Sequence, residues 1–228
     1  MGGHARHRQA GFTIIELMIA TAVFSAVLLL CGMAIVHVGR MYYKGSVTSK
    51  TQDTARKFGE DVSQAIQFGT GNTAPGQFIR TNGPVTQTGG GQTLTNNVMA
   101  RCIGDIRYSY VIGRPQGTNA ASARHAVWRD RLLTTSQPCD PVNLTLADPG
   151  GTAGQEMLAN KMRLARFEVT NLAGLYEIDA VVSYGDADDL FGPAALPEFP
   201  DFSICKGVNA GGQFCASAAY KTTVGKRL

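Results

Sequence analysis

An apolar run near the start of this 228-residue chain limits what the protein can be. Residues 17–39 contain no Asp, Glu, Lys or Arg, and His37 is neutral at pH 7. About 20 apolar residues are enough to cross the hydrocarbon core of a membrane as a helix. Residues 17–36 supply that length, so the sequence predicts a membrane-spanning helix close to the N-terminus.

Charged residues beside the run indicate its orientation. Arg6 and Arg8 precede it with no acidic residue among the first eleven positions. The positive-inside rule therefore places the short N-terminus in the cytoplasm, and residues beyond Arg40 outside it. The net charge of +4 is too small to require a nucleic acid as partner.

Glu16 stands directly before the run, where an acidic residue is unexpected. An unpaired carboxylate at the centre of a bilayer costs about 2.5–3.5 kcal/mol. A cleaved secretory signal would have a shorter apolar region. A plain signal anchor explains the hydropathy but not Glu16, unless its carboxylate reaches back to the membrane interface.

The segment GFTIIELMIATAVFSAVLLL resembles the class III signal of type IV pilins and type II secretion pseudopilins. In that signal a short basic leader ends in Gly and is followed by Phe, by a Glu at the fifth mature position, and by an apolar helix. The resemblance implies that a prepilin peptidase cuts between Gly11 and Phe12, and that Phe12 becomes an N-methylated terminus. It also implies that Glu16 of an incoming subunit pairs with the Phe12 amine of its neighbour, because either charge alone is costly at low dielectric.

Five cysteines bear on the compartment. Cys31 lies in the apolar run, where it is expected to pack as a small hydrophobic residue. The other four lie in the polar part of the chain, and their even number suggests disulfides in an oxidising compartment. Three pairings are possible. The Gly-rich segment CKGVNAGGQFC favours Cys205–Cys215, which leaves Cys102–Cys139.

The helix is predicted to continue beyond the membrane to about residue 68. Apolar residues there follow the spacing of one helical face. They are Ala55, Phe58, Val62, Ala65 and Ile66. We therefore expect a leader at residues 1–11, a membrane or filament-core helix at 12–40, an amphipathic helix half at 41–68, and a β-rich head at 69–228.

Alternating apolar residues predict strands in the head. We expect them near residues 106–112, 125–132, 162–170, 175–184 and 216–224, with a turn at TNLAG. Residues 69–99 are rich in Gly, Thr and Asn and are expected to form a long exposed loop with one short strand near 77–80. One long helix followed by strands predicts an α+β fold in which the helix packs on an antiparallel sheet, as in pilins.

Other candidate sites have simpler explanations. Asp186, Asp188 and Asp189 could ligate calcium, but without an EF-hand spacing a solvated turn is the expected reading. Six basic residues near Trp128 could form a DNA-binding patch, although interleaved acidic residues favour a mixed surface; they are Arg124, Arg129, Arg131, Lys161, Arg163 and Arg166. TGGGQT lacks the lysine of a nucleotide-binding P-loop, and no residue set suggests an enzyme.

These features predict a structural subunit, of the minor-pilin kind, in a type IV pilus or pseudopilus. It would serve adhesion, motility, DNA uptake or protein secretion. The expected partners are other pilins, the prepilin peptidase and methyltransferase, the assembly platform and the inner membrane, with no cofactor. The alternative is a single-pass membrane protein that never polymerises and binds a ligand through its disulfide-bonded domain.

Overall fold

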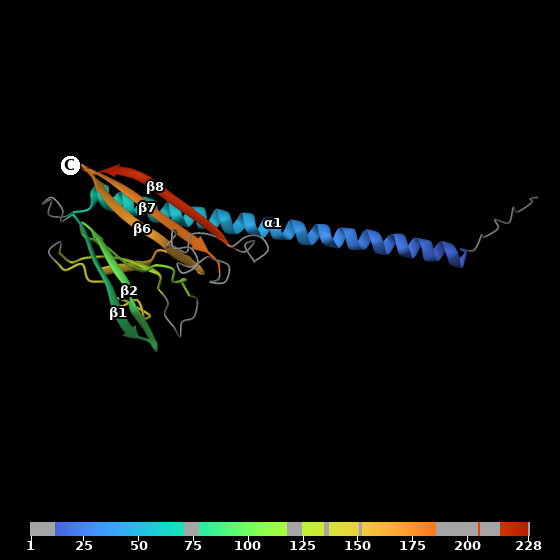
Figure 1. Cartoon of the computed structure of the whole chain (residues 1–228), viewed down its shortest axis with the longest axis horizontal. Coiled ribbons are helices and arrows are strands. Elements are labelled where there is room, and N and C mark those ends of the chain that lie inside the picture. Colours follow the sequence, from blue (N-terminus) through green and yellow to red (C-terminus); the bar gives the residue numbers. More distant parts are fainter. Residues whose placement is uncertain are drawn as a thin grey trace, which may run out of the picture. The chain divides into compact units, whose positions relative to one another are not determined.

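The structure is a computed structural model, and it describes residues 12–70, 78–117, 125–134, 137–150, 152–185, 205 and 215–227. The chain forms two compact units that divide between Tyr43 and Lys44. One helix, α1 (Ile14–Phe68), contributes residues to both units (Figure 1). It has the extent that the apolar run and the amphipathic pattern after it predict, apart from two residues at its start.

In the second unit, called the head here (from Lys44 onward), α1 buries one face. Phe58, Val62 and Ile66 are fully buried, and Ala55 and Ala65 are nearly so. Arg56, Lys57, Glu60 and Gln64 are exposed. The predicted apolar face is confirmed, because residues three and four apart lie on the same side of a helix.

The strands of the head form two sheets, and all neighbouring strands are antiparallel. The first sheet has the order β1 (Ile79–Gly89), β2 (Gln92–Ile103), β3 (Ile106–Val111), β4 (Val127–Arg131) and β5 (Thr152–Glu156). The second has the order β6 (Met162–Leu172), β7 (Leu175–Tyr184) and β8 (Ala216–Gly225). The predicted α+β fold, a long N-terminal helix packed on antiparallel strands, is confirmed, with two sheets in place of one.

The expectation of a long loop over residues 69–99 is wrong. β1 and β2 form a long hairpin there, with a two-residue turn at Gly90 and Gly91 that requires positive φ angles. Thr, Asn and Gln are common in this hairpin, so the alternation of apolar residues is weak. For this reason the two strands were not predicted. The strand β5 was not predicted either.

Among the described residues, the largest apolar core cluster combines side chains of α1 with side chains of both sheets. Its centre is an aromatic cluster in which Phe58 of α1 makes edge-on contacts with Tyr108 and Phe167, at centroid distances of 5.9 and 5.0 Å. The Tyr108 hydroxyl donates a hydrogen bond to Asp61 of α1 at 2.6 Å, and Arg129 of β4 pairs with the same carboxylate at 3.1 Å. Burial, followed by the nearby Asp61 charge, raises the pKa of Tyr108 well above its usual value.

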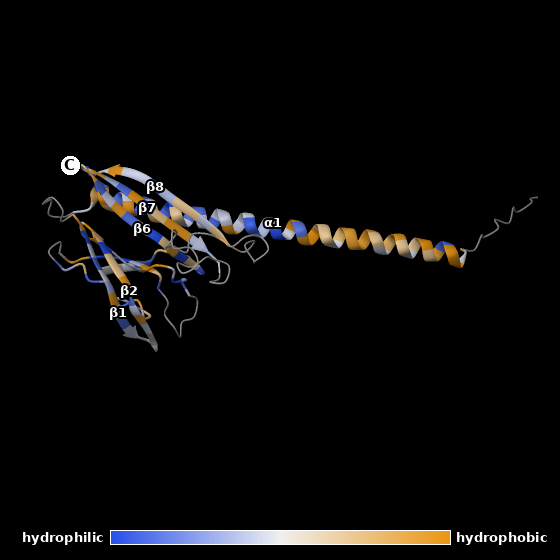
Figure 2. Cartoon of the chain, in the orientation of Figure 1, coloured by the Kyte–Doolittle hydropathy of each residue, from blue (hydrophilic) through white to orange (hydrophobic). Residues whose placement is uncertain are grey.

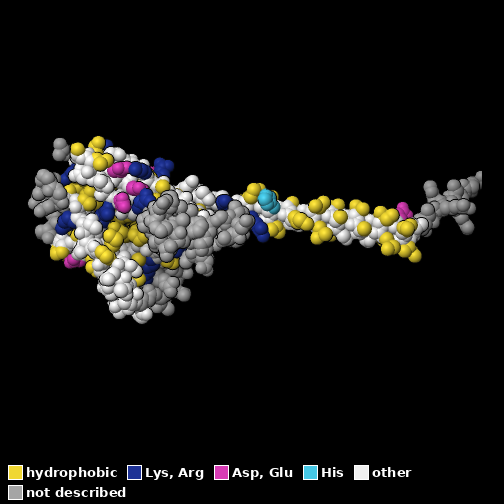
Figure 3. All heavy atoms as spheres, viewed as in Figure 1, with side chains coloured by type: hydrophobic (Ala, Val, Ile, Leu, Met, Phe, Trp, Pro, Cys, Tyr) yellow, Lys and Arg dark blue, Asp and Glu magenta, His cyan; other side chains and the backbone are white. Residues whose placement is uncertain are grey.

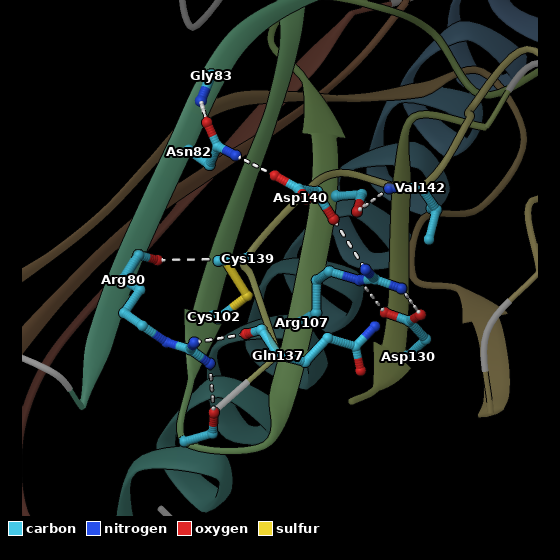
Figure 4. The surroundings of a disulfide bond; sticks show 12 residues. Arg80, Asn82, Gly83, Cys102, Arg107, Asp130, Gln137, Cys139, Asp140 and Val142 are labelled. Carbon is cyan, nitrogen blue, oxygen red and sulfur yellow. Dashed lines mark hydrogen bonds and ion pairs between the residues drawn. A yellow bond between two sulfur atoms is a disulfide. The ribbon is translucent and has the colours of Figure 1, made fainter. Parts of the chain in front are cut away.

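The opposite face of the first sheet is covered by residues 137–150, called the covering segment here. Cys139 of this segment is joined to Cys102 of β2, and Leu144 packs on Val98 and Val111. Around the disulfide, Arg80 donates to the Gln137 carbonyl at 2.7 Å (Figure 4). Because both faces of the sheet are covered, every residue of β3 is buried.

A buried ion pair also lies beneath the covering segment. Arg107 of β3 and Asp130 of β4 form two hydrogen bonds, and Arg107 also donates to the Asp140 carbonyl at 2.8 Å (Figure 4). Asp130 is fully buried. A buried charge is tolerated only when it is paired and hydrogen-bonded, so this network fixes β3, β4 and the covering segment relative to one another.

Candidate functional site

The first turn of α1 carries two polar side chains ahead of the apolar run. The Thr13 hydroxyl accepts a hydrogen bond from the Glu16 backbone N–H at 3.3 Å. The Thr13 carbonyl accepts one from the Leu17 N–H at 3.2 Å. Thr13 is therefore the N-cap of the helix, and Glu16 stands at the position of the acidic residue in a capping box. The role of Thr13 was not predicted, although the spacing Thr-x-x-Glu carries the signal.

The Glu16 carboxylate is exposed and forms no ion pair with any residue that the structure describes. A negative charge in the first turn interacts favourably with the helix dipole, by about 0.3–1 kcal/mol. This contribution is small compared with the cost of placing the charge in an apolar environment. The carboxylate is therefore available to a group outside the chain.

The helix surface that follows Glu16 is apolar and uncovered. In residues 12–43 every side chain is exposed, including Ile14 at 82% and Ile35 at 73%. Hydrophobic residues follow one another along this part of α1 (Figure 2), and Figure 3 shows their side chains on the visible face. This part of the helix is long and apolar enough to cross a membrane. A surface of this kind is stable only when lipid or another apolar surface covers it.

Two hydroxyl groups within the apolar part are satisfied inside the helix. The Thr21 hydroxyl donates to the Met18 carbonyl at 3.0 Å, and the Ser25 hydroxyl donates to the Thr21 carbonyl at 2.8 Å. Neither group needs a hydrogen-bond partner from outside, which suits an apolar environment.

The apolar part ends with aromatic and basic residues. Arg40 is followed by Tyr42 and Tyr43, which are 80% and 42% exposed. Tyr is enriched where a membrane helix meets the interface with water. Residues 17–39 span about 35 Å at 1.5 Å per residue, close to the thickness of a hydrocarbon core.

Several predicted site residues lie outside the described part of the chain. They are Gly11, Arg124 and the calcium candidates Asp186, Asp188 and Asp189. Among the described residues, no group of three His, Cys, Asp or Glu side chains could hold a metal ion.

The structure gives partners to most of the basic residues considered for DNA binding. Arg129 pairs with Asp61, Arg131 with Asp105 and Arg166 with Asp179, at 3.1, 3.0 and 3.2 Å. Arg163 is only 2% exposed and donates to the Gly185 carbonyl at 2.6 Å. These contacts favour the mixed surface over a patch for nucleic acid.

The cysteines of the head form two disulfides, Cys102–Cys139 and Cys205–Cys215. This is the pairing that the Gly-rich segment favours. Cys31 is a free cysteine, and it is exposed on the apolar part of α1.

Comparison with known proteins gives one match. Residues 6–32 match the family model of the prokaryotic N-terminal methylation motif. No curated protein and no solved structure matches the chain. The match contains Thr13, Glu16 and most of the apolar part of α1. Pilin-family proteins with this motif are structural proteins, not enzymes. The chain therefore carries the N-terminal methylation motif, the class III signal that type IV pilins and type II secretion pseudopilins share.

Proposed function

We propose that the chain is cut between Gly11 and Phe12 and becomes a structural subunit of a type IV pilus or pseudopilus. The observation that carries the proposal is the uncovered apolar helix surface of residues 14–43. It begins beside Glu16, whose carboxylate has no ion-pair partner in the described part of the chain. Lipid covers that surface before assembly, and the equivalent helices of other subunits cover it in a filament.

Cleavage would create a charge that its own helix does not stabilise. The new amine at Phe12 would lie one residue before the N-cap, at the positive end of the helix dipole. A carboxylate from another subunit offsets this unfavourable interaction. The Glu16 carboxylate has the required charge and no partner among the described residues. Pairing between subunits removes two isolated charges from an apolar bundle and fixes the axial stagger of neighbouring helices.

The length of the apolar surface determines how deeply the helix lies in the membrane before assembly. With residues 17–39 in the hydrocarbon core, Glu16 would lie at the cytoplasmic interface, and Tyr42 and Tyr43 at the opposite one. At the interface the carboxylate remains hydrated. Its burial would occur only on assembly, when the partner amine is present.

We assign residues 1–11 to the leader and 12–40 to the membrane and filament-core helix. We assign residues 41–68 to the helix half that packs on the sheets, and 69–228 to the extracytoplasmic β-rich part of the head. The size of the head supports a minor pilin. The partners would be other pilins, the prepilin peptidase and methyltransferase, the assembly platform and the inner membrane. The assembled subunit would be found in a surface or periplasmic filament.

An epitope-tagged copy tests the proposal in cells of the source organism. We expect the tag in filaments sheared from the cell surface or recovered from the periplasm. Glu16→Ala should stay in the membrane fraction and be lost from the filaments. Glu60→Ala, which removes an exposed carboxylate from the head part of α1, is the matched control and should assemble normally. Normal recovery of Glu16→Ala in filaments would contradict the proposed role of the carboxylate.

A further inference from the structure

One end of the head carries most of its exposed large hydrophobic side chains. Beyond the apolar part of α1, five such residues are exposed among those described. Leu146 lies on the covering segment, next to Gly89 of the β1–β2 hairpin. The other four are Phe68 at 63%, Leu133 at 81%, Leu172 at 47% and Leu175 at 50%, called the distal patch here.

Three members of the distal patch lie near one another at the end of the head where α1 terminates. Phe68 is the last residue of α1, and the Arg227 guanidinium lies 5.5 Å from its ring centroid. Leu172 and Leu175 are paired across the β6–β7 turn. Leu175 also lies beside Gly225, two residues before Arg227.

A polar cleft of about 260 Å³ opens beside Phe68. Its lining includes Phe68 and Thr70. It also includes two ion pairs, Arg129 with Asp61 and Arg131 with Asp105. The chain continues from Arg131 to Leu133, and Leu132 donates its N–H to the Asp105 carbonyl at 2.8 Å. The cleft therefore borders Phe68 of the distal patch, and Leu133 follows one of its lining residues, Arg131, by two positions.

Three basic side chains lie at this end of the head. The Arg131 side chain is 63% exposed and pairs with Asp105 at 3.0 Å. Lys226 lies over the Phe78 ring at 4.3 Å, and Arg227 lies over Phe68. Neither of these two basic side chains has an acidic partner in the part of the chain that the structure describes. Glu177, on the adjacent stretch of β7, is already paired with Lys221.

We propose that the distal patch and the polar cleft beside Phe68 bind an acidic surface of another protein that also presents apolar side chains. Exposed apolar groups beside basic residues are typical of a protein interface. Charge complementarity selects the sign of the partner. A second copy of this end would place Arg131, Lys226 and Arg227 against like charges, so the partner is a different surface. This inference does not depend on how the N-terminus is processed.

The test uses the full chain in nanodiscs of neutral lipid and two fluorescent peptides, with empty nanodiscs subtracted. In one peptide leucines are spaced among glutamates, and in the other among lysines. Fluorescence anisotropy should show roughly tenfold tighter binding of the glutamate peptide, falling as salt rises. Arg131→Glu combined with Arg227→Glu should abolish this preference. Leu172→Ser combined with Leu175→Ser should weaken binding while leaving its salt dependence unchanged.

Leu146→Ser is the matched control, because Leu146 is an exposed leucine outside the distal patch. It should bind the glutamate peptide as well as the unchanged protein does. All substituted side chains are largely exposed, and circular dichroism checks that each variant is folded. Equal binding of the two peptides, binding of neither, or an equal loss in Leu146→Ser would overturn the proposal. So would a dimer in sedimentation experiments that Leu172→Ser dissociates.

Discussion

Glu16 occupies the acidic position of a capping box, and it also carries a negative charge. A substitution can test these two properties separately. Glutamine is also accepted at this position of a capping box, so Glu16→Gln keeps the cap and removes the charge. We expect Glu16→Gln to be as defective in filament assembly as Glu16→Ala, with normal cleavage of the leader. The amount of each variant in sheared filaments measures this. Assembly by Glu16→Gln but not by Glu16→Ala would show that the cap matters and the charge does not.

We expect an alanine substitution to have opposite effects on stability at Gly59 and at Gly45. A Cβ atom at Gly59 would collide with the Tyr220 ring of β8, whereas nothing lies within 4 Å of the corresponding position at Gly45. Gly59→Ala should lower the stability of the head by about 1–3 kcal/mol through overpacking. Gly45→Ala should raise it by up to about 1 kcal/mol, because Ala is the better helix former.

Thermal unfolding of the head, followed by circular dichroism, measures both variants under the same conditions. A stabilising Gly59→Ala would mean that α1 and β8 do not approach as closely as the structure indicates.

His125 gives the head a pH dependence. Its Nδ1 lies 3.3 Å from the Glu156 carboxylate, and its ring makes an edge-on contact with Trp128. Hydrogen bonding to Glu156 raises the pKa of His125 above its usual 6.5, against the opposing effect of burial. A raised pKa means that the contribution to stability is fully present below the unfolded-state pKa, and is lost as pH rises through the folded-state pKa.

The unchanged protein should therefore have a higher melting temperature than His125→Gln. The difference should be largest below pH 6.5 and should shrink as the pH rises above 6.5. Melting curves for both proteins across this range provide the measurement. A difference that grows with pH would contradict the assignment of His125 as a protonated partner of Glu156.

At the scale of elements, the sequence predicts best where the hydrophobic period is clear. α1 and β7 were located to within two residues, because their apolar positions recur regularly. The β1–β2 hairpin was missed because Thr, Asn and Gln fill its exposed positions, and the covering segment hides its other face. Nothing in the local sequence of residues 137–150 indicates that they lie on a sheet. The Cys102–Cys139 disulfide ties this segment to β2.

The two disulfides should stabilise the head to different extents. In the chain-entropy model the cost of removing one rises with the length of the loop it closes. Sequence separations of 37 and 10 residues correspond to about 4 and about 3 kcal/mol. Removing Cys102–Cys139 by double alanine substitution should also release the covering segment from β2.

Urea unfolding of the two double-alanine variants measures the difference. Limited proteolysis should cut the variant that lacks Cys102–Cys139 within the covering segment, and leave that segment intact in the variant that lacks Cys205–Cys215. An uncut covering segment in both variants would show that Arg80 and Arg107 hold it without the disulfide.

At the scale of the whole molecule, the two units have opposite requirements. The head buries its own apolar core and contains two disulfides. In contrast, all apolar side chains of residues 14–43 are exposed. The sequence was sufficient to predict the second property, since it follows from hydropathy and from the signal around Glu16. It could not predict the distal patch, because Phe68, Leu133, Leu172 and Leu175 belong to four separate segments that only the fold brings to one end.

The N-terminus of the mature protein is the most direct test of the central claim that proteolysis creates the amine that pairs with Glu16. Intact-mass and peptide mass spectrometry of the protein purified from its own membranes can identify that residue. We expect a chain that begins at Phe12 and carries an N-methyl group. A protein that keeps its first eleven residues would have no such amine, and the proposed filament assembly would be wrong.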